Sequence, residues 1–113
     1  MLASEPIELN AVDATAQLAQ KGRLTLTAAR IFAASAAADI FLQLFDAAAV
    51  TDVTVGTTIP RWVVMLDSAA APVSAGDGLP TDGLTFYRGI VVACTTTPTG
   101  NTGSAANVRL AVR

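Results

Sequence analysis

The sequence of 113 residues contains no histidine and only one cysteine, Cys94. Without histidine the chain lacks the commonest general base and metal ligand, so Ser-His-Asp and Cys-His catalytic sites are excluded. A single cysteine cannot form an intrachain disulfide, and zinc sites of the usual kind need several Cys or His ligands. Because Cys94 lies in an apolar run, we expect it to be a small buried residue. We therefore predict no enzymatic activity, no cofactor and no metal.

Charged residues are also scarce, at 14% of the chain, whereas about 25% is ordinary for soluble domains. The seven Lys and Arg residues are scattered from Lys21 to Arg113, and the net charge is −2. Proteins that bind nucleic acids concentrate such residues to neutralise phosphates, so we predict no nucleic-acid partner. Apolar residues make up 52% of the sequence. This composition suits close assembly with other subunits, although a compact monomer can share it.

The stretch from Ala28 to Val50 is long and apolar, and it admits three interpretations. A membrane span is disfavoured because Asp39 and Asp46 would each cost about 2.5–3.5 kcal/mol near the centre of a membrane helix. A soluble helix is favoured by the many alanines and by the absence of Gly and Pro. Strands are favoured because the apolar cluster after Asp39 leaves too narrow a polar face for a surface helix. We expect strands and no membrane association, with a helix as the alternative.

The segment from Asp39 to Asp46 reads DIFLQLFD and is apolar at both sets of alternate positions. Successive side chains of a strand point to opposite faces of the sheet. The two sets are Ile40, Leu42 and Leu44 on one face and Phe41, Gln43 and Phe45 on the other. The segment from Gly89 to Thr97 has the same character. One face can cover the core of the domain, and the other then needs a second layer or another subunit.

Other segments alternate more simply. Trp62, Val64 and Leu66 share one face of a predicted strand, and the stretch from Asn107 to Arg113 places Val108, Leu110 and Val112 on another. Residues 67–83 and 98–106 are rich in Gly, Pro and Asp-Gly turns, which is typical of loops. Several short strands separated by such loops indicate an all-β fold, and we predict an antiparallel β-sandwich, jelly-roll-like, for residues 21–113.

Residues 1–20 have weaker patterns. Ile7 and Leu9 alternate with Glu8 and Asn10, and the remainder is Ala, Thr and Gln without a firm period. We predict that residues 1–20 form an N-terminal arm that lies across a neighbouring subunit. Terminal disorder is the alternative.

Three segments together resemble a class of small β-sandwich proteins of tailed bacteriophages. A strand of the form aromatic-Leu-Gln-Leu-Phe-Asp-Ala stands at residues 41–47, a Gly-Thr-Thr turn ending in Pro60 stands at residues 56–60, and a Gly-Leu-x-Phe-x-x-Gly-Ile strand with a Thr run occupies residues 83–97. Here Ile59 separates Thr58 from Pro60, where the pattern of the class can be shorter. The resemblance extends over about 60 residues and contains no catalytic motif.

This resemblance implies a structural virion protein: a capsid decoration or cement subunit, or a small head, neck or tail component. It implies a location on the capsid surface after synthesis in the host cytoplasm. The implied partners are sister subunits, in trimers as a first guess, and the major capsid protein or another shell protein.

Candidate interface residues follow from the two-sided strand, the arm and the exposed aromatics. Phe41 and Phe45 lie on the second face of their strand, Ile7 and Leu9 form the patch on the arm, and Tyr87 alternates with Phe86, so that one of the two should face outward. A glycan- or receptor-binding module on the virion is the alternative function, with residues 67–83 and Tyr87 as the contact surface.

Overall fold

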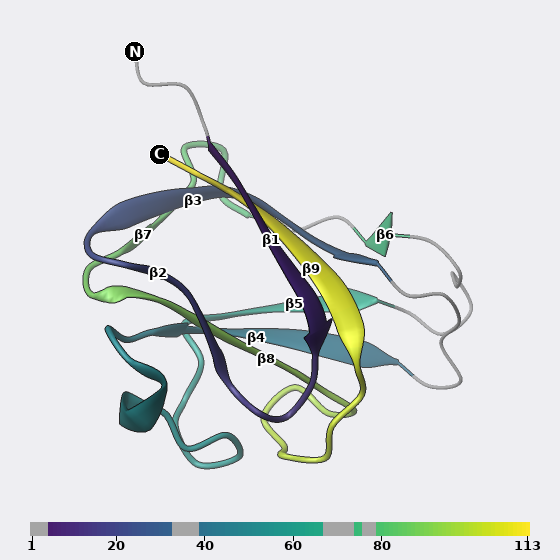
Figure 1. The fold of residues 1–113 in the computed structure, drawn as a ribbon. Helices are drawn as coiled ribbons and strands as arrows, with labels where there is room; N and C mark the ends of the chain where they lie inside the picture. Colours follow the sequence, from purple (N-terminus) through teal and green to yellow (C-terminus); the bar gives the residue numbers. More distant parts are fainter. Residues whose placement is uncertain (1–4, 33–38, 67–73, 76–78) are drawn as a thin grey trace.

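A computed structural model of the protein describes residues 5–32, 39–66, 74–75 and 79–113. The fold is all-β, with two antiparallel sheets packed face to face as a β-sandwich (Figure 1). The strands of sheet A, in spatial order, are β1 (Glu5–Val12), β9 (Ala106–Val112), β3 (Leu24–Phe32) and β6 (Ser74–Ala75), with β7 (Leu84–Phe86) also paired to β3. The strands of sheet B are β2 (Gln17–Lys21), β8 (Gly89–Thr95), β4 (Ile40–Asp46) and β5 (Trp62–Leu66).

The strand pairs are nested along the sequence. β1 pairs with β9, β2 with β8, β3 with β7 and β4 with β5, all antiparallel. This is the pattern of a long hairpin rolled up so that its successive pairs alternate between two sheets, which is the arrangement of a jelly roll. The predicted jelly-roll-like sandwich is therefore confirmed.

The prediction of an N-terminal arm is wrong for the residues that the structure describes. β1 is hydrogen-bonded along sheet A, where Ile7 lies opposite Leu110 and Leu9 opposite Val108. β2 pairs with β8 in sheet B. Both are edge strands of their sheets. The sandwich therefore begins near Glu5, and not at residue 21.

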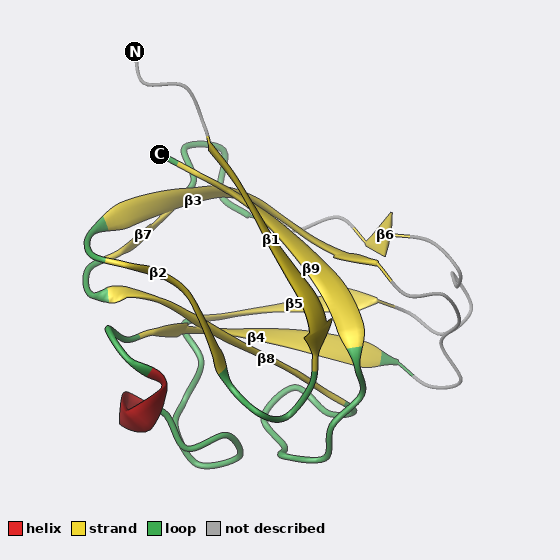
Figure 2. Cartoon of the chain, in the orientation of Figure 1, coloured by secondary structure: helices red, strands yellow, loops and turns green. Residues whose placement is uncertain are grey.

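The alternative prediction for residues 28–49 was a helix. The described residues of this stretch, 28–32 and 39–49, contain no helix. β3 continues to Phe32 and β4 begins at Ile40, and residues 33–38 lie outside the described residues. Within the described ranges, the only helical element is the single 3-10 turn η1 (Val50–Asp52), drawn in red in Figure 2. No described helix is long and apolar enough to cross a membrane.

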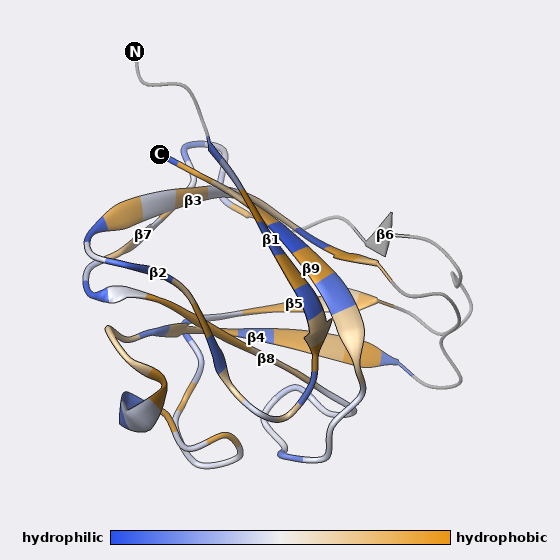
Figure 3. Ribbon diagram, viewed as in Figure 1, coloured by the Kyte–Doolittle hydropathy of each residue, from blue (hydrophilic) through white to orange (hydrophobic). Residues whose placement is uncertain are grey.

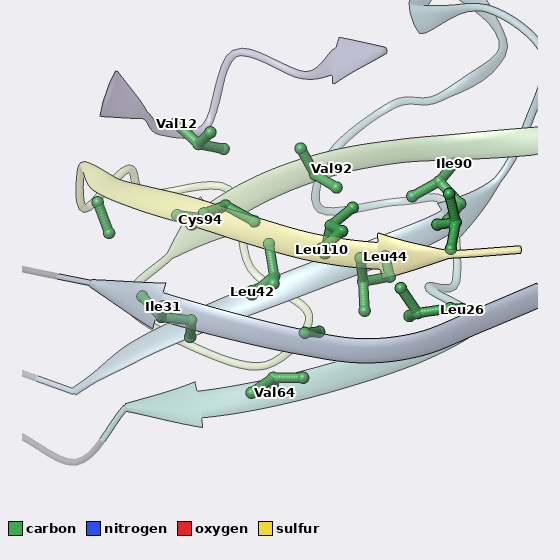
Figure 4. Close-up of a cluster of buried hydrophobic side chains, with 14 of the residues drawn as sticks. Val12, Leu26, Ile31, Leu42, Leu44, Val64, Ile90, Val92, Cys94 and Leu110 are labelled. Atoms are coloured by element: carbon green, nitrogen blue, oxygen red, sulfur yellow. The ribbon is translucent and has the colours of Figure 1, made fainter. Parts of the chain in front are cut away.

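The core lies between the two sheets, and the strands supply it by alternation. On β9, Val108, Leu110 and Val112 are buried and Arg109 is exposed, as predicted. Figure 3 shows this alternation of hydrophobic and hydrophilic residues along β1 and β9. Figure 4 shows side chains from both sheets meeting in one cluster. The labelled members are Val12, Leu26, Ile31, Leu42, Leu44, Val64, Ile90, Val92, Cys94 and Leu110.

Candidate interaction surfaces

The outer face of sheet B is apolar, and the chain itself covers its middle. Phe45 on β4 and Val91 and Ala93 on β8 are fully buried, although they point away from the core between the sheets. Val53 and Val55 pack against them from the segment that follows β4. The second layer expected from the sequence is thus supplied here by the same chain. Phe45 is 1% exposed in this structure, so it is not a surface contact residue.

A buried amide extends this covered region. Gln43 is fully buried, and its Nε2 donates hydrogen bonds to Thr95 Oγ1 at 2.7 Å and to the Gly100 carbonyl at 3.0 Å. Thr95 Oγ1 in turn donates to the Thr97 carbonyl at 2.7 Å. These bonds fix the loop after β8 against the outer face of β4. The Gln43 Oε1 atom is buried without a hydrogen-bond partner, which costs about 1–3 kcal/mol.

The flank of sheet B formed by β4 and β5 is less well covered. Phe41 lies directly opposite Met65 in the register, and Val63 lies two residues before Met65 on the same face. Met65 is 45% exposed, and Phe41 and Val63 are half-buried. β5 is also the edge strand of this sheet. We call Phe41, Val63 and Met65 the β4–β5 flank; it is an apolar surface without a charged residue.

Ile7 and Leu9 do not form an outer patch. Both are half-buried and pack against the core cluster between the sheets. Their alternation with Glu8 and Asn10 was predicted to mark an apolar patch that contacts a neighbouring subunit. It marks instead the side of β1 that faces the core. The predicted contact of these two residues with a neighbouring subunit is replaced by contact within the sandwich.

Tyr87 is 58% exposed, and two arginines from other parts of the chain lie near its ring. The Arg23 Cζ atom lies 5.1 Å from the centroid of the Tyr87 ring, and the Arg61 Cζ atom lies 5.9 Å from it. Arg61 Nε donates a hydrogen bond to the Thr85 carbonyl at 2.8 Å, which fixes its head group. Arg88 is the next residue along the chain. We call Tyr87, Arg23, Arg61 and Arg88 the Tyr87 cluster.

Backbone hydrogen bonds hold this corner in place. The Asp46 carboxylate, at the end of β4, accepts hydrogen bonds from the backbone N–H groups of Tyr87 at 3.1 Å and Arg88 at 2.8 Å. The N–H of Gly22 donates to the Arg88 carbonyl at 2.8 Å. This bond joins the turn before Arg23 to the turn after β7. The aromatic ring and the arginines therefore project from rigid turns.

Gly89 makes the change of sheet possible at this corner. Its φ is 149°, and a Cβ atom would lie 2.6 Å from the Gln20 carbonyl oxygen and 2.7 Å from that of Ala47. Only glycine fits such a position. The chain thus leaves β7 of sheet A and enters β8 of sheet B within two residues, and Tyr87 and Arg88 lie at the outside of this bend.

An open hollow of about 460 Å³ lies beside the cluster. Arg61 and Arg88 line it together with Asp46, Asp52 and Ile59. The Ile59 side chain, which stands between Thr58 and Pro60 in the turn before β5, is 86% exposed. The hollow thus combines two cationic groups, two carboxylates and an exposed apolar side chain.

No local pattern in the sequence indicates this gathering of cations. Residues 23, 61 and 88 are far apart along the chain, and only the fold brings them together. Among the residues that the structure describes, the ion pair within 4.0 Å joins Glu8 and Arg109, and none of the three arginines of the cluster takes part in one. The Lys and Arg residues are scattered along the sequence, but at this corner the fold brings three of the arginines close together.

Cys94 behaves as the sequence predicted, as a small buried residue in the core. Burial raises the pKa of its thiol to about 12, and the nearby negative charge of Asp13 adds to the effect. The thiol therefore stays protonated and unreactive at neutral pH. Within the described ranges, no three His, Cys, Asp or Glu side chains are grouped so that they could hold a metal ion.

Comparison with protein-family models, with curated proteins and with solved structures gives no match for this chain. Its class is therefore defined by the fold alone: a small all-β protein with two antiparallel sheets packed as a sandwich.

Proposed function

We propose that this chain is a non-enzymatic structural protein of a virion, and specifically a capsid decoration or cement subunit. In this proposal it stabilises the head of a tailed bacteriophage by binding sister subunits and the major capsid protein or another shell protein. The observation that carries the proposal is the β4–β5 flank, where Phe41 of β4 lies opposite Met65 of the edge strand β5. The phage-like sequence pattern and the jelly-roll order, which also occurs in viral capsid domains, support it by analogy.

The physical mechanism is burial of this flank between subunits. Each square ångström of apolar surface removed from water contributes about 25 cal/mol before the cost of association. One small contact of this kind is weak, but a shell repeats it many times. The low charge of the chain reduces the desolvation cost of such contacts. Trimers are the first assembly to look for, as the resemblance implies.

A lysine in the β4–β5 flank tests the proposal. Met65→Lys should remove self-association in analytical ultracentrifugation and should weaken binding to phage particles that lack the subunit. Asn10→Lys is the matched control, because Asn10 is exposed on an edge strand of the other sheet and gains the same charge. Unchanged assembly and binding in Met65→Lys, with the dichroism spectrum of the native chain, would contradict the role of the flank.

The alternative is a glycan- or receptor-binding module, and the exposed ring of Tyr87 favours it, because sugars stack on such rings. Most of the proposed contact loop, residues 67–73 and 76–78, lies outside the described residues. Titration with host cell-surface polysaccharide separates the two functions. Binding that Tyr87→Ala removes and Met65→Lys leaves intact would favour the alternative.

A further inference from the structure

We propose that the Tyr87 cluster binds an acidic segment of a partner protein, with the carboxylates of the segment between the arginines and an apolar side chain of it on Ile59. This surface shares no residue with the β4–β5 flank. The inference therefore does not depend on the proposed function, and a Met65→Lys substitution should leave it intact.

The first argument is electrostatic. Two guanidinium groups stand within 6 Å of the same ring, and Arg88 lines the same hollow as Arg61. Like charges held close together are unfavourable unless an anion lies between them. Among the described residues no carboxylate forms an ion pair with these arginines. A bound carboxylate would gain charge-assisted hydrogen bonds from the guanidinium groups.

The second argument concerns geometry. Arg61 uses its Nε donor to hold the Thr85 carbonyl, which leaves its terminal NH₂ groups for a ligand. Arg23 and Arg61 also contact the ring of Tyr87, so their planes are ordered before a partner arrives. A preorganised site loses less side-chain entropy on binding. The cluster therefore resembles the Tyr- and Arg-rich centres that dominate the energy of protein interfaces.

The third argument selects the class of partner. Asp46 and Asp52 line the same hollow, and the whole chain carries a charge of −2, so a dense polyanion such as a nucleic acid would be repelled. A glycan could stack on the Tyr87 ring, but it carries no apolar side chain to place on Ile59. The exposed Ile59 side chain offers an apolar contact, and a peptide supplies such a contact together with carboxylates. A protein segment with one or two acidic residues beside an apolar one fits all three features.

An NMR titration with the acetylated and C-terminally amidated peptide Glu-Leu-Glu, which has two carboxylates and one apolar side chain, tests the inference on the full chain. The peptide should shift the amide signals of residues 22, 23, 59, 61 and 87–89 at an ionic strength of about 0.15 M. Arg88→Gln and Tyr87→Ala should each weaken its binding about tenfold, a loss of about 1.4 kcal/mol. Arg30→Gln is the matched control, because it removes the same charge from the exposed surface of β3 in sheet A and should leave binding unchanged.

Three outcomes would overturn the inference. Equal weakening by Arg30→Gln would mean that only the overall charge attracts the peptide. Equal binding of the matching Gln-Leu-Gln peptide would mean that the carboxylates are not recognised. Tighter binding of tetragalacturonate than of the acidic peptide would make this corner a site for acidic glycans.

Discussion

The outer faces of the two sheets follow opposite rules. On sheet A, Glu8, Arg109 and Arg30 form a row across β1, β9 and β3, as is usual for the solvated side of an antiparallel sheet. On sheet B, Phe45 and Val91 occupy the corresponding outer side and are completely buried by other parts of the chain. A strand that is apolar on both faces therefore does not by itself indicate a partner. Only the part of the outer apolar face that the chain itself leaves exposed can indicate a binding partner.

The largest effect should come from removing the strands at the start of the chain. Deleting residues 1–21 removes β1 and β2, the first members of two nested pairs. β8, whose residues are all buried, would become an edge strand of sheet B. We expect loss of the cooperative thermal transition and aggregation, measured by dichroism and light scattering. A truncated chain that melts like the intact one would restore the interpretation of these residues as an arm.

The next prediction compares a residue on the covered outer face of sheet B with a residue between the two sheets. Phe45→Ala should lower the free energy of unfolding by about 3–5 kcal/mol, because it empties the space beneath the covering segment. Leu110→Ala, between the sheets, should lower it by about 2–5 kcal/mol. Urea denaturation of both variants measures this. A loss below 1 kcal/mol for Phe45→Ala would mean that the cover of sheet B is not part of the folded core.

Some of this arrangement could be predicted from the sequence and some could not. The inward face of β9 was predicted correctly because this strand alternates with a period of two and has one clear apolar set. The cover over Phe45 was missed because Val53 and Val55 alternate like a strand, although they lie in a turn-rich segment after η1. A local pattern shows which side chains avoid water, and it does not show which segment will cover them.

The Tyr87 cluster was hidden for a different reason. Tyr87 could be singled out as an exposed aromatic because it alternates with the buried Phe86. The arginines around it come from two other turns, and contacts between turns are set by how the strand pairs nest. Ile7 and Leu9 show the same limit, since their inward direction depends on pairing with β9. Such contacts between distant segments do not appear in the local pattern of apolar and polar residues.

The buried amide of sheet B offers a test of intermediate size. Thr95→Val removes the acceptor of one Gln43 hydrogen bond, and should cost about 1–3 kcal/mol because a buried donor loses a partner. The double variant Gln43→Leu with Thr95→Val removes both polar groups and the unpaired Oε1, so it should be more stable than Thr95→Val alone. Thermal denaturation in a double-mutant cycle measures this. A double variant less stable than either single one would mean that the amide contributes more to stability than its unpaired oxygen costs.

The smallest effect should come from the charged face of sheet A. Arg109 and Glu8 form an ion pair with Nη2 and Oε1 2.6 Å apart, but both side chains are more than half exposed, at 56% and 61%. Exposed pairs of this kind contribute at most about 1 kcal/mol, and salt screens them. The Arg109 guanidinium also lies 5.4 Å from the centroid of the Phe32 ring, which adds a contact that salt affects less. Arg109→Ala should therefore lower the free energy of unfolding by less than about 1 kcal/mol, and part of this loss should disappear in about 1 M salt. A loss as large as that of Leu110→Ala, independent of salt, would mean that the outer face of sheet A also carries a buried layer, and the contrast between the two sheets would no longer hold.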